Sequence, residues 1–321
     1  MKRNGSGGAR VVAFGGGHGL AVSLRALRRL AGEQHLDLTA VVTVADDGGS
    51  SGRLRADRAV LPPGDLRQAL AALADEAATA ELFQYRFGGN DPLAGHPVGN
   101  LVLAGLLEML GDPVAALDHA AGLLRARGRV LPMSRVPVAI EADVRGPGGT
   151  VRVVRGQHEV AVTRDEVTRV RILPPHPPAC AEALAAVRAA DWLIFGPGSW
   201  YTSVIPHLLV PELAEAILTS PAHRLVTLNL AAELETAGLS LPDHLGALMS
   251  YLPELRADIV LADGKAVGDP EPVRRAAESL GARLVLAPVA VADGTPRHDP
   301  AALAAALQPI LDPDSGQHHA R

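Results

Sequence analysis

Short buried runs alternate with helical repeats at both ends of the chain. Residues 10–14 (RVVAF) predict a buried strand, and the apolar residues between Leu20 and Leu30 recur at helical spacing. The same pattern predicts further strands at 38–44, 191–195, 224–230, 257–262 and 283–287, with helices between them. Strands separated by helices indicate a doubly wound, mostly parallel α/β sheet of the Rossmann-like type, covered on both faces.

The middle of the chain departs from this alternation twice. Residues 65–128 are expected to be mostly helical, with Asp112 as the cap and Pro113 as the first residue of one helix. Residues 130–172 alternate β-branched and polar residues around a glycine-rich hairpin turn at 146–149. This second stretch predicts a small β-rich insertion.

Length and composition fit one domain of this kind. The chain has 321 residues, 48% of them hydrophobic, which suffices for a sizeable core. We expect a single domain from 10 to 311, with disordered tails at 1–9 and 312–321. The net charge of -5, without a basic block, argues against a nucleic-acid partner.

The sequence also predicts a cytoplasmic location. No apolar run reaches the roughly 18 uncharged residues that a membrane span needs. No signal-type apolar segment follows the basic N-terminus. The single cysteine, Cys180, suits a reducing compartment, and its Pro-rich surroundings do not indicate a nucleophile.

A cluster of glycines joins the first predicted strand to the first predicted helix. It consists of Gly15, Gly16, Gly17 and Gly19. Such a turn tolerates positive φ, and the exposed N–H groups at the helix start attract an anion such as phosphate. The dinucleotide fingerprint fails at its third glycine, where Leu20 or Val22 stands, and a P-loop would need Lys and then Ser or Thr after the last glycine. The cluster therefore predicts a phosphate site of neither type.

Other predicted strands also end in glycine-rich or polar residues. The strand at 38–44 is followed by Asp46 and Asp47 inside a turn-rich loop at 45–52. The later strand ends carry Gly196, Gly198, Ser199 and Asn229, and a helix is expected from near Thr202. Doubly wound folds bind ligands beyond the carboxyl ends of their strands, so these residues are expected to meet at one cleft. The two aspartates could hold a magnesium ion together with ligand phosphates.

Further side chains are candidates for ligand contacts. Arg53, Arg55 and Arg67 could grip a diphosphate through their planar guanidinium groups, although Arg55 is explained equally well as a solvated surface residue. Tyr201, just past the second glycine turn, could stack on a base ring, whereas Trp192 and Phe195 are better explained as core residues. No Cys/His cluster predicts a zinc site, and no Gly-x-Ser-x-Gly elbow predicts an acyl-transfer nucleophile.

Several motifs together resemble one known family. They are GGGHGL at 15–20, TVADDGGSSGRLR at 43–55, LPPGDLRQALAALAD at 61–75, LFQYRF at 82–87, GHPVGNL at 95–101, GPGSWYTSVIPHLLV at 196–210 and RHD at 297–299. This set is similar to the YvcK-type gluconeogenesis factors, which are related to 2-phospho-L-lactate transferase. The resemblance implies a cytoplasmic protein that binds UDP-sugars, notably UDP-N-acetylglucosamine, and affects cell shape and envelope synthesis during gluconeogenic growth.

The resemblance and the residue patterns together define an expected ligand-binding set. Its members are Gly15, Gly16, Gly17, Gly19, Leu20, Asp46, Asp47, Gly48, Ser50, Arg53, Gly64, Asp65, Arg67, His96, Asn100, Gly196, Gly198, Ser199, Tyr201, Thr202, Asn229 and Arg297. The chain departs from the family pattern at His18, at Pro97-Val98 and in residues 231–238. Pro300 follows the RHD motif where the family often has Thr, so a phosphorylation switch at that position would be missing.

Three functions remain open at this stage. The first is a regulator whose bound UDP-sugar changes its affinity for a protein partner in envelope synthesis, with or without oligomerisation. The second is a magnesium-dependent transferase of the phospholactate type, in which positioning and electrostatics do most of the work. The third is an NAD(P)-linked oxidoreductase, for which Asp46 stands where a ribose-binding acid would be but the glycine spacing is wrong.

Overall fold

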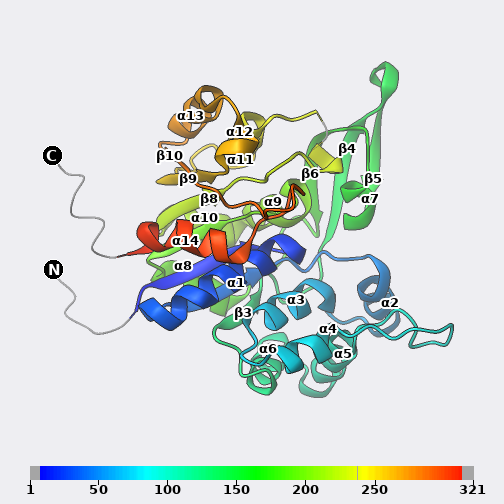
Figure 1. Cartoon of the computed structure of the whole chain (residues 1–321). Helices are drawn as coiled ribbons and strands as arrows, with labels where there is room; N and C mark the ends of the chain where they lie inside the picture. The colour runs from blue at the N-terminus through cyan, green and yellow to red at the C-terminus, as the bar shows by residue number, and fades with distance from the viewer. Residues whose placement is uncertain (1–7, 237, 313–321) are drawn as a thin grey trace.

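The computed structural model describes residues 8–236 and 238–312, and a parallel sheet crosses the centre of this part (Figure 1). The order of its strands is β10-β9-β8-β7-β1-β2-β3, and every neighbouring pair is parallel. The strands are β1 (Arg10–Gly15), β2 (Asp37–Val42), β3 (Arg129–Pro132), β7 (Trp192–Phe195), β8 (His223–Thr227), β9 (Ile259–Ala262) and β10 (Arg283–Leu286). The predicted strands and α/β class are confirmed, although β8 ends two residues before Asn229.

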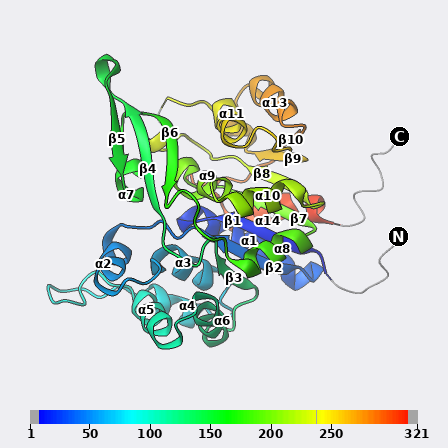
Figure 2. The ribbon, with the colours of Figure 1, turned by 180° about the vertical axis from the view of Figure 1, so that it is seen from behind.

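Helices cover both faces of this sheet. On one face, α1 (Gly17–Gln34) packs against α14 (Pro300–Leu311). On the other face, which Figure 2 shows in front, α8 (Ala181–Ala189) packs against α10 (Pro211–Thr219). The remaining elements of this half are η2 (Trp200–Val204), α9 (Ile205–Leu208), η3 (Leu234–Thr236), α11 (Leu241–Tyr251), α12 (Gly264–Val267) and α13 (Pro270–Ser279).

The segment between β2 and β3 is helical, as predicted. Its helices are α2 (Gly49–Arg58), α3 (Pro63–Leu73), α4 (Ala77–Gln84), α5 (Val98–Leu110) and α6 (Pro113–Leu123). The prediction of a loop over residues 45–52 is wrong for residues 49–52, because α2 begins at Gly49. Burial explains the difference, since Ser50, Ser51 and Leu54 pack inward and compensate for the weak helix propensity of the glycines.

The β-rich insertion forms a separate three-stranded antiparallel sheet. Its strands are β4 (Ala139–Arg145), β5 (Val151–Arg155) and β6 (Glu166–Leu173), in the order β5-β4-β6. The predicted hairpin turn is confirmed as η1 (Pro147–Gly149). Two details differ from the sequence expectation: residues 130–132 belong to the central sheet, and α7 (Gln157–Ala161) interrupts the strands.

The adjacent strands β1 and β7 bring the two glycine turns together. Phe14 pairs with Phe195 in register across these strands. Their rings stack with centroids 4.9 Å apart, and both are fully buried. The residues that follow, Gly15 on one strand and Gly196 on the other, therefore leave the sheet side by side.

The tails predicted at 1–9 and 312–321 lie almost entirely outside the described residues. No described helix is long and apolar enough to cross a membrane.

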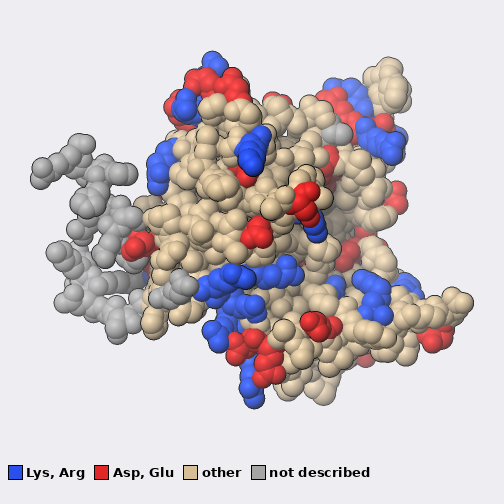
Figure 3. Space-filling view, viewed as in Figure 1, with Lys and Arg blue, Asp and Glu red and all other residues tan. Residues whose placement is uncertain are grey.

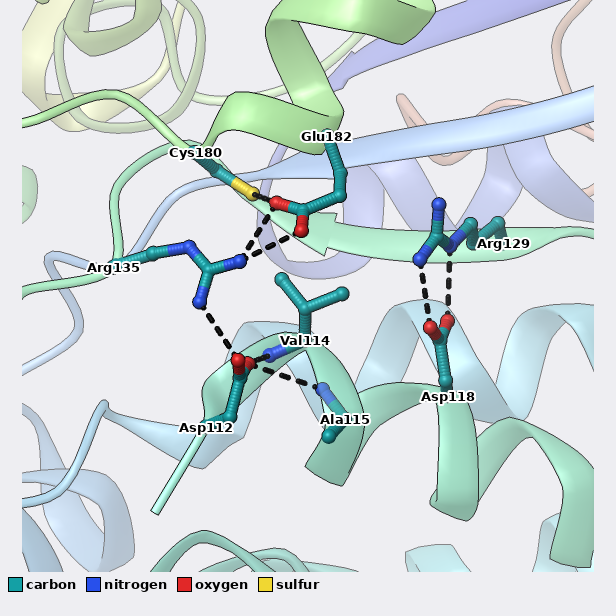
Figure 4. A network of polar contacts seen from close by, with 8 residues as sticks. All are labelled: Asp112, Val114, Ala115, Asp118, Arg129, Arg135, Cys180 and Glu182. Carbon is teal, nitrogen blue, oxygen red and sulfur yellow. Dashed lines mark hydrogen bonds and ion pairs between the residues drawn. The ribbon is translucent and has the colours of Figure 1, made fainter. Parts of the chain in front are cut away.

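An arginine after β3 ties the helical segment to α8 (Figure 4). Asp112 caps α6 by accepting from the amide of Val114 at 2.7 Å, as the sequence predicts, and also accepts from Arg135 at 3.0 Å. The other end of the Arg135 guanidinium binds Glu182 in α8 at 2.7 Å. Both carboxylates raise the pKa of Arg135, so the bridge stays charged.

We expect Arg135→Ala to lower the free energy of unfolding by about 1 to 2 kcal/mol, because two carboxylates lose a shared partner. Chemical denaturation measures this change. Arg129→Ala is the matched control, since Arg129 binds only Asp118, at a more exposed position, and should lose less than about 1 kcal/mol. Equal losses in both variants would show that the bridge adds nothing to an ordinary surface ion pair.

Candidate functional site

The two glycine turns touch each other at the carboxyl edge of the sheet. A Cβ atom added at Gly19, in the first turn of α1, would lie 2.3 Å from the carbonyl oxygen of Pro197 and 2.5 Å from the Cα of Gly198. Gly17 has φ of 56°, a left-handed conformation that favours glycine. These glycines are required by close backbone approach as well as by the turn itself.

A cavity of about 930 Å³ opens beside the two turns. Its lining comes from residues that follow β1, β2, β7 and β8, together with α3, α7 and the loop after β10. The sequence-predicted residues that line it are Gly16, Gly17, Gly19, Asp46, Gly48, Asp65, Gly198, Ser199, Thr202, Asn229 and Arg297. The expectation that the strand ends meet at one cleft is thus supported by half of the proposed set.

The protein's own side chains use some of the turn amides. The amide of Gly17 donates to Asp65. Asn229 binds Gly198 twice, because its Oδ1 accepts from the amide at 2.9 Å and its Nδ2 donates to the carbonyl at 2.9 Å. Within the part of the chain that the structure describes, the amides of His18 and Gly19 donate to no protein acceptor. The open donors for an anion therefore lie in the first turn of α1.

Two carboxylates form the floor of the cavity next to that helix start. Asp65 accepts from the hydroxyl of Thr43 at 2.8 Å, and Asp46 accepts from the amide of Gly48 at 3.0 Å. Gly64 leaves room for Asp46, since a Cβ there would lie 2.2 Å from its Oδ2. Burial, and then the charge of Asp46, raise the pKa of Asp65 from 3.8 to about 7. A pair that resists ionisation in this way is suited to a cation.

Asp47 does not belong to this pair. Its two carboxylate oxygens accept from the amides of Gln157 at 3.1 Å and His158 at 2.9 Å, at the start of α7. It does not line the cavity. The structure therefore places Asp65, and not Asp47, beside Asp46 at the cavity, which differs from the expected pairing of Asp46 with Asp47. Among the described residues, no group of three or more His, Cys, Asp or Glu side chains is placed to hold a metal ion.

Another group of predicted residues forms a buried chain behind the cavity. Arg67 donates to Asn100 at 2.8 Å, and Asn100 donates to the Ser50 hydroxyl at 2.9 Å. Ser50 lies 2.7 Å from Nδ1 of His96. Burial lowers the pKa of Arg67 to about 10. This chain fastens α2, α3 and α5 together, so its members position the site and do not line it.

The other predicted contacts also lie outside the cavity. Arg53 donates to the carbonyl of Ala94 at 2.8 Å and is exposed. Tyr201 is buried, and its amide donates to Glu235 at 2.9 Å, so the expected base stacking finds no support. The positions with packing roles are Gly15, Leu20, Gly64 and Gly196. No Phe, Tyr or Trp stands among the described lining residues.

Several lining residues were not expected from the sequence. They are His18, Arg25, Gln68, Gln157, His158, Glu233 and His298. Three of them lie within a quoted motif: His18 in the glycine turn, Gln68 in the stretch at 61–75 and His298 in RHD. Glu233 accepts a hydrogen bond from the hydroxyl of Ser199. The neighbouring Glu235 is buried, and burial and the charge of Glu233 raise its pKa to about 7.

Comparison with known proteins shows which family the chain belongs to. Residues 11–285 match the family described as 2-phospho-L-lactate transferase CofD. The chain belongs to the CofD family. It is 50% identical over 317 residues to a putative gluconeogenesis factor of Mycobacterium tuberculosis. This alignment covers 95% of this chain and 91% of that protein.

More distant relatives agree with this assignment. The chain is 37% identical over 278 residues to the gluconeogenesis factor of Bacillus subtilis, covering 86% of this chain and 84% of that one. A crystal structure of a UPF0052 family protein from Bacillus halodurans superposes with a TM-score of 0.83 at 34% identity, covering 95% of this chain and all of that one. Within the CofD family, the chain thus lies with the gluconeogenesis factors, as its motifs predict.

Proposed function

We propose that this gluconeogenesis factor relative is a cytoplasmic regulator that binds a nucleotide-sugar, UDP-N-acetylglucosamine, in the cavity beside the two glycine turns. The observation that carries the proposal is the first turn of α1, where the amides of His18 and Gly19 donate to no acceptor among the described residues, next to a cavity of about 930 Å³. Helix N-termini of this kind bind phosphate groups. The volume falls in the upper part of the range, roughly 300 to 1,000 Å³, of small-molecule sites.

In this proposal, occupancy of the cavity changes the affinity for a protein partner in envelope synthesis, which links cell shape to growth on gluconeogenic carbon sources. A sensor of this type needs differential affinity between two states of the protein and no acid–base pair. Among the described lining residues, the hydroxyl of Ser199 donates to the carboxylate of Glu233, and no hydroxyl is hydrogen-bonded to a histidine. Cys180 lies outside the cavity, and burial raises the pKa of its thiol to about 11.

A magnesium-dependent transferase of the phospholactate type is the second candidate, and the Asp46–Asp65 pair favours it. These carboxylates fit a magnesium ion, which binds proteins through one or two carboxylates and completes its shell with water and phosphate oxygens. The ion would neutralise charge on a nucleotide donor. The chain itself positions the two carboxylates, because the hydroxyl of Thr43 donates to Asp65 and the amide of Gly48 donates to Asp46.

Calorimetry distinguishes the candidates. We expect the protein to bind UDP-N-acetylglucosamine with micromolar affinity and without turnover, more tightly than GDP or NADH. Donor consumption that depends on magnesium would favour the transferase, and a preference for NADH would favour the oxidoreductase. Failure to bind any of the three would contradict a nucleotide site.

The Asp46→Asn variant tests the carboxylate floor. We expect it to remove most of the magnesium dependence of nucleotide affinity, about tenfold, because one of the two carboxylates of the pair is neutralised. Asp47→Asn is the matched control, because Asp47 caps α7 outside the cavity and should change stability without changing the magnesium dependence. Unchanged magnesium dependence in Asp46→Asn would remove this carboxylate from the site.

A further inference from the structure

The cavity has two chemically different ends on either side of the glycine turns. The end beyond β2 is polar, with Asp46, Asp65, Gln68 and His158. The end beyond β8 carries apolar side chains on both of its segments, namely Leu230, Ala231, Ala232, Val291 and Pro296, together with Asn229, Glu233, Arg297 and His298. A flat base suits the apolar end and a hydroxyl-rich sugar suits the polar one.

The loop after β10 is held over the apolar end. The imidazole of His298 donates a hydrogen bond to the backbone carbonyl of Leu228, just past the end of β8. Ala290 and His298 also form an antiparallel bridge within the loop. Val291 and Pro296 are thereby fixed opposite the residues that follow β8, and the apolar end has two walls.

Glu233 stands at this end as a carboxylate without a cation. Its side chain accepts from the Ser199 hydroxyl, and among the described residues no arginine, lysine or histidine forms an ion pair with it. Arg297 also lines the cavity from the loop after β10, but its guanidinium is paired with Asp293 at 2.6 Å. Further basic side chains gather over α1, as Figure 3 shows, and Arg25 of this helix lines the cavity. Phosphates are favoured near α1 and disfavoured at Glu233, because like charges repel at short range.

We infer that Glu233 binds the vicinal hydroxyl groups of the ribose, so that the nucleoside lies at the β8 end and the sugar at the β2 end. A carboxylate offers acceptor sites only, and two adjacent hydroxyl groups can donate to its two oxygens in charge-assisted bonds. Ser199 holds the carboxylate in place from behind. This inference rests on the proposed nucleotide function and adds the direction in which the ligand lies.

Titrations of wild type and Glu233→Gln with UDP and 2′-deoxy-UDP test the assignment. Wild type should bind UDP about tenfold more tightly than 2′-deoxy-UDP. Glu233→Gln should weaken the binding of UDP five- to tenfold, because the two ribose hydroxyl groups lose a charged acceptor. It should change the binding of 2′-deoxy-UDP less than twofold, because that ligand already lacks one of the two hydroxyl groups. Glu254→Gln, at an exposed position outside the cavity, is the matched control and should behave like wild type.

A second variant tests the opposite end. His158→Ala should weaken UDP-N-acetylglucosamine at least threefold and leave UDP unchanged, because UDP lacks the sugar. Unfolding midpoints of both variants near the wild-type value show that the fold is intact.

Equal losses for UDP and 2′-deoxy-UDP in Glu233→Gln, or a wild type that does not distinguish them, would overturn the ribose assignment while leaving the nucleotide site in place. A loss in Glu233→Gln confined to UDP-N-acetylglucosamine would place the sugar at this carboxylate and reverse the direction. A wild type that binds no UDP ligand would overturn the proposed function itself.

Discussion

Replacing Gly19 with alanine is expected to lower the free energy of unfolding by about 1 to 3 kcal/mol and to weaken UDP-N-acetylglucosamine at least 100-fold. The added methyl group would lie 2.3 Å from the carbonyl oxygen of Pro197 and 2.5 Å from the Cα of Gly198. Both are backbone atoms, so the second turn must move away from the first. Chemical denaturation and calorimetry on the same preparation measure the two effects.

Gly32 provides the control within the same helix. A Cβ atom at this position meets nothing within 4 Å, so Gly32→Ala should raise the unfolding free energy by about 0.5 to 1 kcal/mol through helix propensity alone. It should leave ligand affinity unchanged. If Gly19→Ala were as stable and bound as tightly as Gly32→Ala, the contact between the turns would have no part in the site.

Neutralising Asp65 has the second large expected effect, and its sign depends on pH. The folded-state pKa of Asp65 is raised from 3.8 to about 7. Between these values the folded protein holds more protons than the unfolded chain, so stability falls as pH rises through this window. The Asp65→Asn variant lacks this loss. We expect it to unfold with a free energy roughly 1 to 3 kcal/mol higher than wild type at pH 8, and with a smaller difference at pH 5.

The same variant should bind a magnesium–nucleotide complex at least tenfold more weakly at pH 8, because one of two carboxylates is gone. Denaturation curves at pH 5 and pH 8, with magnesium titrations at pH 8, measure both effects. Glu235 also has a raised pKa and contributes a residual slope, so Glu235→Gln serves as the comparison for stability. A variant less stable than wild type at pH 8 would show that the buried carboxylate is already neutral there or favourably paired.

The sheet could be predicted from the sequence because each strand is a short apolar run between helical repeats. Parallel strands buried on both faces, such as β1 and β9, need such runs. The glycine turns could also be predicted, because their glycines directly follow predicted strands in the sequence. Helix α2 was missed because its two glycines are typical of a loop, and only burial of Ser50 and Leu54 against the neighbouring helices stabilises it as a helix.

The site could be predicted only where chemistry and local position coincide. Asp46 follows a strand and faces the cavity, but the adjacent Asp47 points to the start of α7, more than 100 residues further along the chain. Glu233 and Arg25 carry no local motif, since their roles depend on which loop and which helix face border the cavity. The buried chain from Arg67 to His96 resembled a binding group because buried polar residues and ligand contacts have the same composition.

The hydrogen bonds of Asp47 connect two parts of the molecule. By accepting from the first amides of α7, it links the end of β2 to the insertion that carries β4, β5 and β6. Gln157 and His158, whose amides make those contacts, line the cavity. The same insertion also carries the hairpin of β4 and β5, which protrudes from the molecule (Figure 1). A protein that bound this hairpin would therefore contact the same insertion that supplies a wall of the cavity.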